Sequence, residues 1–423
     1  MKTNKTLLSC AVAFGLASVS TFTQAAGFQL AEYSATGLGR AYAGEAAMAD
    51  NASAQWRNPA MLTYLEGTQV SAGAIYVNPN VDVEGTVNHA QLGKTHASSN
   101  DFAHDAVIPN FYLSHQLNEQ VALGFALGTN YGMETDLGTE FAASHFGNQA
   151  SVISKEANLN IAYQILPQLS IGGGVRYVMG EGHFGATAPA KNALKLPQGT
   201  TLKYMEGEDT SWGWQVGSAW QINQDHRVGF AYKSEVVMDF EGHAEGVSYG
   251  SYKPGMMSVT LPATAELASF HRLNDQWAIH ASINWTDWSS FKELTAVFPE
   301  KSDLIKSENW EDNYRFALGT TYQYDAKLAL RAGVAYDTSA VDDKNRTATI
   351  PETDRTWVSV GGSYVATPQL TLDAGFTYIF AKDATINEPR DASDQTAAAI
   401  GGAFTGNVSG NVWLIGVQAN YRF

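Results

Sequence analysis

The chain has 423 residues, with 42 acidic and 26 basic side chains and a formal net charge of −16. This acidic balance argues against nucleic acid as a partner. The sequence has a single cysteine, Cys10, and no apolar run of about 18 residues, so composition excludes a disulfide framework and a transmembrane helix. A secreted soluble β protein and a transmembrane β-barrel both remain open at this level.

Residues 1–25 have the features of a secretory signal peptide. Two lysines precede the apolar segment LLSCAVAFGLASV, and small residues near the end favour cleavage before Ala26. Lipidation at Cys10 is the alternative, but it would leave most of the apolar segment on the mature chain. We therefore expect an exported protein whose mature form has no cysteine.

Residues 26–67 differ from the rest of the chain, because they are rich in Ala and Gly and lack the alternation of a strand. Asn58 is a candidate N-cap with Pro59 at the first helical position, so Asn58, Pro59 and Ala60 predict a short capped turn. Small side chains allow such short helices to pack closely in a confined space. The pattern predicts a helical plug, here called the hatch.

Residues 68–423 are predicted to form strands, because long segments alternate apolar with small or polar side chains, as strands between lipid and lumen do. In the last segment Trp413, Ile415 and Val417 share one face. Short turns alternate with long polar loops, which predicts a 14-stranded antiparallel transmembrane β-barrel that encloses the hatch. The predicted strands are 68–79, 107–116, 120–132, 154–165, 169–184, 208–222, 226–241, 256–272, 276–291, 309–324, 327–337, 354–366, 369–382 and 410–423.

Three segments that follow the signal peptide in order, AGFQL, GLGRAYAGEAA and RNPAML, resemble the hatch of the FadL family of outer-membrane long-chain fatty acid transporters. The resemblance continues at NWTDWSSF (284–291), WEDNYRFALGTT (310–321), RAGVAYD (331–337) and IPETDRTW (350–357), and in a closing strand that ends in Phe. It implies a location in the bacterial outer membrane and passive uptake of long-chain fatty acids. The ligand would be captured at extracellular loops and held in a pocket inside the barrel that the hatch gates.

The resemblance also implies which residues contact the ligand. Phe28 and Leu30 lie in the N-terminal tail of the hatch, and Thr129 and Tyr131 lie in the third predicted strand. Lys306 is expected to bind the carboxylate head group.

The third predicted strand is also where the resemblance places a lateral exit through the barrel wall. The matching segment is GFALGTNYG at 124–132, and Asn130 and Gly132 are the candidate residues of the opening. Glycines in a strand suit a kink, since Gly weakens the ladder and tolerates unusual dihedral angles.

The same alternation predicts arginines that face the lumen, and we expect them to pair with acidic neighbours rather than with the ligand. Some family members carry further basic pocket residues, but none is found here around Ala186 or Phe380, so Lys306 is the one head-group candidate. The lumenal arginines are Arg176, Arg315, Arg331 and Arg355, and their candidate partners are Asp312, Asp354 and Asp373.

We expect no enzyme, because the mature chain has no HExxH, no GxSxG and no cysteine nucleophile. No catalytic residue, metal or cofactor is predicted. The expected partners are outer-membrane lipid, lipopolysaccharide and the barrel assembly machinery, and the barrel is expected to be a monomer. Two other functions remain open: uptake of aromatic or other hydrophobic compounds, and a role as surface adhesin or phage receptor. A diffusive porin would need an unplugged lumen, which the hatch argues against.

Overall fold

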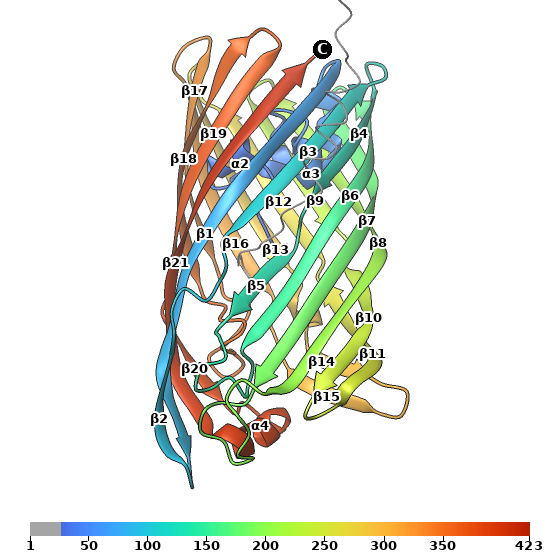
Figure 1. Cartoon of the computed structure of the whole chain (residues 1–423). Coiled ribbons are helices and arrows are strands. Elements are labelled where there is room, and N and C mark those ends of the chain that lie inside the picture. The colour runs from blue at the N-terminus through green and yellow to red at the C-terminus, as the bar shows by residue number, and fades with distance from the viewer. Residues whose placement is uncertain (1–26) are drawn as a thin grey trace, which may run out of the picture.

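The computed structural model describes residues 27–423, and the predicted signal peptide lies outside the described residues. The chain forms a closed antiparallel barrel with a small helical domain inside one end (Figure 1). The first and last strands, β1 (Thr68–His89) and β21 (Ala403–Arg422), close the barrel by pairing from Gln69 with Arg422 to Asn88 with Ala403.

Fourteen strand positions make up the described wall, which confirms the predicted fold class. The uninterrupted positions are β1, β3 (Ala106–Gln116), β6 (Gln149–Leu166), β7 (Leu169–Thr187), β8 (Thr201–Asn223), β17 (Leu328–Asp337), β18 (Arg355–Thr367), β19 (Leu370–Ala381) and β21. The interrupted positions are β4 (Val121–Gly128) with β5 (Gly132–Asp136), β9 (His226–Lys233) with β10 (Val236–Gly246), β11 (Gly250–Leu261) with β12 (Thr264–Arg272), β13 (Trp277–Thr286) with β14 (Glu293–Val297), and β15 (Ser302–Ser307) with β16 (Asn313–Gln323).

Two further strands and seven short helices complete the described elements. β2 (Gly93–Ser99) pairs with the end of β1, and β20 (Ala384–Glu388) pairs with β21. The helices are α2 (Ala35–Leu38), η1 (Glu45–Ala47), α3 (Ala54–Arg57), η2 (Pro59–Tyr64), η3 (Trp288–Ser290), η4 (Ala392–Asp394) and α4 (Gln395–Gly401).

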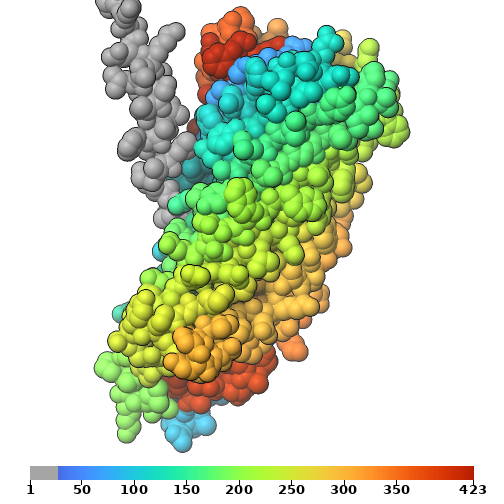
Figure 2. All heavy atoms as spheres, turned by 90° about the vertical axis from the view of Figure 1, so that its right-hand side faces the viewer, coloured from blue at the N-terminus to red at the C-terminus, as the bar shows by residue number. Residues whose placement is uncertain are grey.

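The connections differ at the two ends of the barrel. Short turns lie at the end that holds the hatch and the C-terminus, and the long connections lie at the opposite end with β2, β14 and α4 (Figure 1). This asymmetry identifies the hatch end as periplasmic and the opposite end as extracellular. In Figure 2 the colours follow chain order across the wall, as an up-and-down sequence of neighbouring strands requires.

Several strands are longer than the alternation predicted. β1 has 22 residues, β8 has 23 and β21 has 20, although about ten residues suffice to cross the membrane. The additional residues extend toward the extracellular end, where water replaces lipid and both faces of a strand can carry polar side chains. The lipid-facing alternation is therefore absent at this end, so the predicted strands are shorter than the observed ones.

The outward face of the wall is apolar. On β8, Trp214 is 49% exposed whereas the next residue, Gln215, is 1% exposed, and the alternation continues with Val216 outside. The predicted stripe of β21, which includes Ile415 and Val417, is likewise exposed. A continuous band of this kind matches the hydrocarbon core of a bilayer. Among residues 27–423 no helix is long and apolar enough to cross a membrane.

The hatch packs directly on glycines of the lumenal face. A Cβ at Gly172 would lie 2.5 Å from the backbone nitrogen of Ala60, and a Cβ at Gly229 would clash with the backbone oxygen of Ala46. Because these positions carry no side chain, the hatch backbone approaches the wall closely. The glycines that looked unremarkable in the strands therefore form the seat of the hatch.

Replacing Gly229 by Leu should displace the hatch and leave the wall intact, since a side chain at this position has no space beside Ala46. We expect a higher single-channel conductance in planar bilayers, with unchanged heat-modifiable migration of the barrel. Gly173→Leu is the matched control, because the nearest atom to a Cβ at that position is 3.5 Å away. Equal conductance of the two variants would contradict this account of the hatch seat.

Candidate functional site

The third strand position is broken at the residues where a kink was predicted. β4 ends at Gly128 and β5 begins at Gly132. β3 pairs with β4, whereas the described ladder of β5 is with β6, apart from an isolated bridge from Ala103 to Thr135. The wall therefore contains a stretch between β3 and β5 that has no continuous ladder (Figure 1).

The N-terminal tail of the hatch pairs with this break. Gln29 forms an isolated antiparallel bridge with Tyr131. The backbone N–H of Leu30 donates to the oxygen of Asn130 at 2.7 Å, and the N–H of Gly132 donates to the oxygen of Phe28 at 2.8 Å. The structure thus brings together the predicted tail residues and the predicted residues of the opening.

The ring of Phe28 lies at the centre of an aromatic group, here called the Phe28 cluster. Its centroid lies 4.5 Å from that of Trp288, 5.5 Å from Phe291, 6.0 Å from Trp310 and 6.2 Å from Tyr131. All five side chains are buried. Edge-on pairs of this kind add to the free energy gained from burial.

Sequence reasoning missed three members of the Phe28 cluster. Trp288, Phe291 and Trp310 occur in segments that carried the family resemblance, but they were read as parts of continuous strands. In the structure they lie in the breaks between β13 and β14 and between β15 and β16. In a strand break the side chains no longer alternate between the two faces. The Asp and Ser residues of NWTDWSSF are the sequence signal that could have indicated this break.

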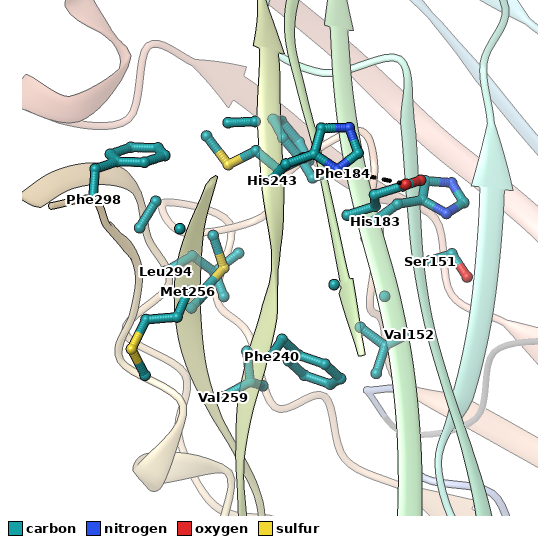
Figure 3. A pocket seen from close by; sticks show the side chains of 18 residues that line it. Ser151, Val152, His183, Phe184, Phe240, His243, Met256, Val259, Leu294 and Phe298 are labelled. Carbon is teal, nitrogen blue, oxygen red and sulfur yellow. Dashed lines mark ion pairs between the residues drawn. The ribbon is translucent and has the colours of Figure 1, made fainter. Parts of the chain in front are cut away.

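A cavity of about 100 Å3 lies in the extracellular half of the barrel, at the wall formed by β6, β7, β8, β10, β11 and β14 (Figure 3). Inward-facing apolar side chains line most of it. They are Val152, Phe184, Met205, Phe240, Met257, Val259, Leu294 and Phe298. The lining also includes residues next to these in the strands, which face the opposite side of the wall: Ser151, His183, Glu206, His243 and Met256.

Four glycines in one cross-strand row explain why the wall is thin at this cavity. Gly182 of β7 pairs with Gly207 of β8, which pairs with Gly242 of β10, which pairs with Gly255 of β11. Adjacent strands thus contribute no side chain at the same height. A Cβ at Gly255 would lie 2.7 Å from the ring of Phe298, so the missing side chain lets Phe298 pack against the wall.

An apolar column connects the cavity to the break. Phe240 and Val259 line the cavity and belong to the same buried cluster as Met238, Leu261 and Phe28. Among residues 27–423 these apolar side chains form one continuous cluster between the cavity and the Phe28 cluster. A hydrophobic molecule therefore meets apolar surface from the extracellular half to the break.

Lys306 lies beside the cavity, on β15 rather than at the break. It is 4% exposed, and its Nζ is 4.9 Å from the ring centroid of Phe184, which lines the cavity. Its one hydrogen bond goes to Thr349 Oγ1 at 3.4 Å. Within residues 27–423 no carboxylate forms an ion pair with it. A buried ammonium group that no carboxylate contacts directly is costly, so its donors are available to an incoming anion.

A polar network holds the break in place. Asn130 Nδ2 donates to Glu156 Oε2 at 2.5 Å, and Lys233 Nζ donates to Asn130 Oδ1 at 3.2 Å. Arg176 forms a bidentate pair with Glu156, with both hydrogen bonds at 2.8 Å. Thr129 is buried at the start of the break, next to this network.

The predicted hatch motif joins the hatch to the wall. Asn58 Oδ1 accepts from the backbone N–H of Ala60 at 3.0 Å, with Pro59 at the start of η2. The Nδ2 of Asn58 donates to the oxygens of Ala46 at 2.6 Å and Ser218 at 3.0 Å. The amide therefore caps η2 and ties two hatch segments to β8.

Below the Phe28 cluster the lumen is filled by the hatch and by ion pairs. Arg40 pairs with Glu45 at 2.6 Å, and the cavity beside Gln29 and Arg57 measures about 40 Å3, which suits water rather than an acyl chain. The lumenal arginines pair with acidic residues, as expected. Their partners are Glu156 for Arg176, Asp337 for Arg315, Asp373 for Arg331 and Glu352 for Arg355.

Two of the predicted acidic partners were wrong. Asp312 accepts from the Trp285 indole at 2.7 Å, and Asp354 pairs with Lys382 at 3.2 Å. Only Asp373 pairs with a lumenal arginine as predicted. Partner choice depends on the register between neighbouring strands, which sequence alternation does not supply.

These features define a class of protein. A closed barrel with an apolar outer band, a plugged lumen and a buried apolar cavity is an outer-membrane transport barrel for hydrophobic compounds, rather than an open porin. Among residues 27–423 no three His, Cys, Asp or Glu side chains gather as metal ligands would.

The comparisons with known proteins specify the family. The model of the family described as outer membrane protein transport protein (OMPP1/FadL/TodX) matches residues 16–423, and the chain belongs to this family. It is 33% identical to the long-chain fatty acid transport protein of Escherichia coli O6:H1 over 99% of each chain. This confirms the FadL family and the outer-membrane location. The family and its solved relatives transport compounds, which confirms that the chain is not an enzyme.

Two solved structures share the fold. A FadL homologue of Pseudomonas aeruginosa superposes with a TM-score of 0.85 at 20% identity, covering 94% of this chain and all of that chain. The toluene transporter TbuX of Ralstonia pickettii superposes with a TM-score of 0.67 at 18% identity, with the same coverage. At these identities the likeness concerns the fold alone.

Proposed function

We propose that the protein takes up long-chain fatty acids across the outer membrane and releases them sideways through the break between β3 and β5. The observation that carries this proposal is the position of Lys306, a buried ammonium group that forms no ion pair within residues 27–423 and lies at the end of an apolar column. The column suits an acyl chain, and the ammonium suits its carboxylate. The relative from E. coli named a fatty acid transport protein supports the same ligand class.

Capture begins at the extracellular loops. Leu194 lies in the connection before β8, and its side chain is 49% exposed. Val247, in the turn between β10 and β11, is 55% exposed, and Tyr252, near the start of β11, is 64% exposed. The two connections are adjacent, because the N–H of Val247 donates to the oxygen of Thr201. Exposed apolar side chains above the cavity supply a first contact for a hydrophobic ligand.

Sideways release follows from the polarity of the path. Each buried methylene gains about 0.8 kcal/mol, so a long acyl chain favours apolar surroundings over the polar hatch layer with its ion pairs. The break beside Tyr131 offers a route from the apolar column into the lipid. Phe28 and Leu30 occupy this route, so the tail must move before the ligand leaves.

Uptake of radiolabelled oleate by a transporter-null host that expresses this chain tests the proposal. We expect saturable uptake that an Asn58→Ala, Pro59→Ala variant loses at equal barrel abundance, since the hatch would no longer be seated on β8. Entry of toluene without oleate would favour the alternative that the aromatic residues of the Phe28 cluster support, uptake of aromatic compounds. Entry of neither compound would overturn both transport functions and favour the adhesin or phage receptor.

A further inference from the structure

Five charged side chains from two distant segments are buried beneath the extracellular loops and are here called the loop charge cluster. Arg390 lies between Glu308 and Asp394, and the charges of Lys306, Arg390, Asp394 and Glu308 act on the pKa of Glu388. Lys306 and Glu308 come from β15 and the connection after it, whereas the other three come from the end of β20 and the following connection. All five side chains are at least 95% buried. The members are Lys306, Glu308, Glu388, Arg390 and Asp394.

The hydrogen bonds of the cluster are incomplete. Arg390 Nε donates to Asp394 Oδ2 at 3.2 Å, and Arg390 Nη1 lies 3.8 Å from Glu308 Oε2, which also accepts from Trp310 Nε1 at 3.2 Å. Within residues 27–423 both carboxyl oxygens of Glu388 lack a hydrogen-bond partner, although the side chain is 98% buried. In the same part of the chain, Glu308 Oε1 and Arg390 Nη2 also lack partners.

The unmatched atoms are mostly acceptors, which is unusual for a site that receives a carboxylate. A carboxylate from the ligand satisfies the donors of Lys306 and Arg390, but it accepts hydrogen bonds and donates none. With three carboxylates already present, it would also bring a fourth negative charge beside two positive ones. Such an excess is costly in a buried site. One proton on Glu388 removes a charge and supplies the missing donor.

We propose that Glu388 takes up one proton for each ligand carboxylate that enters the site. This inference rests on the proposed function, in which Lys306 binds the head group. The proton leaves a hydronium ion of the external water and forms an O–H bond on Glu388, which then donates a hydrogen bond to the ligand carboxylate. No other covalent bond changes, and when the ligand leaves, this O–H bond breaks and the proton returns to water.

The surroundings of Glu388 support this role. Burial raises its pKa to about 7, although the charges of Lys306 and Arg390 act in the opposite direction, and the carboxylates of Asp394 and Glu308 raise it further. A ligand carboxylate would also raise the pKa of Glu388, as Asp394 and Glu308 do. Affinity should therefore be constant below about pH 7 and fall by about tenfold per pH unit above it, until the pKa of the occupied site is reached.

A ligand that stays charged at every pH separates titration of the protein from titration of the ligand. Hexadecanesulfonate meets this condition, and its affinity for the purified full-length protein can be measured by calorimetry between pH 5.5 and 9. Titrations in two buffers of different ionisation enthalpy count the protons taken up. We expect uptake approaching one proton per ligand above pH 7 in the native protein. Glu388→Gln should bind without proton uptake and with pH-independent affinity.

Glu311→Gln is the matched control, because Glu311 follows Glu308 closely in the chain but is exposed and lies outside the cluster. This variant should keep the native proton uptake. Binding without proton uptake in the native protein would overturn the role of Glu388 and leave the proposed function intact. Proton uptake that persists in Glu388→Gln would also overturn it. Absence of sulfonate and oleate binding at every pH would overturn the proposed function and this inference together.

Discussion

A disulfide between residues 29 and 131 should abolish uptake reversibly. Gln29 and Tyr131 face each other as a narrow antiparallel pair, because the hydrogen bonds join Leu30 to Asn130 and Gly132 to Phe28. The Cα atoms of such a pair are about 4.5 Å apart, which lies within the range that a disulfide bridges. In the double variant Gln29→Cys, Tyr131→Cys the oxidised tail cannot leave the break, so oleate uptake should fall to the level of cells without the protein.

The single cysteine of the sequence, Cys10, lies in the predicted signal peptide, so we expect the mature chain to have none. No native cysteine then competes for the introduced cross-link. Reduction should restore uptake to the level of the two single-cysteine variants, which account for the loss of either native side chain. Full uptake by the oxidised double variant, with the cross-link verified by mass spectrometry, would show that the tail does not gate the exit. Surface binding of oleate should be unchanged in both redox states.

Replacing Lys306 by Met should weaken oleate binding by about 10- to 100-fold, which corresponds to the loss of a hydrogen bond to a charged group. Met keeps the length of the side chain and its contact with Phe184, and it removes a buried charge. Equilibrium binding of a fluorescent fatty acid to the purified protein measures the change.

The head-group role of Lys306 has an internal comparison. Oleyl alcohol has no carboxylate, so its affinity should be the same in the native protein and in Lys306→Met. Lys301→Met serves as the control, because Lys301 lies in the exposed turn before β15 and its side chain is 55% exposed. An equal loss of affinity for the acid and the alcohol would indicate a change in the shape of the cavity instead.

The gating and head-group predictions place the two ends of the ligand at different heights in the barrel. The carboxylate lies near Lys306 in the extracellular half, while the acyl chain extends along Phe240 and Val259 toward Phe28. A chain long enough to reach Phe28 would press on the tail that closes the break. Ligand length and tail release are therefore coupled by the geometry of the column.

The architecture could be predicted from local patterns of side chains in the sequence. A strand between lipid and lumen must alternate, so Trp413, Ile415 and Val417 could be assigned to lipid from their spacing alone. The cap at Asn58 was readable because it depends on neighbours two residues away. The break near Gly132 was found only where the family resemblance directed attention to it.

The tertiary structure decided everything that depends on how distant strands are aligned. Arg315 selects Asp337 because the register of β16 and β17 sets them opposite each other. Phe28 and Trp288 meet because the tail pairs with the break, and Arg390 meets Glu308 because two extracellular connections pack together. Alternation specifies which face a side chain occupies, whereas its partner on that face is specified by register, strand breaks and loop packing, which no local pattern encodes.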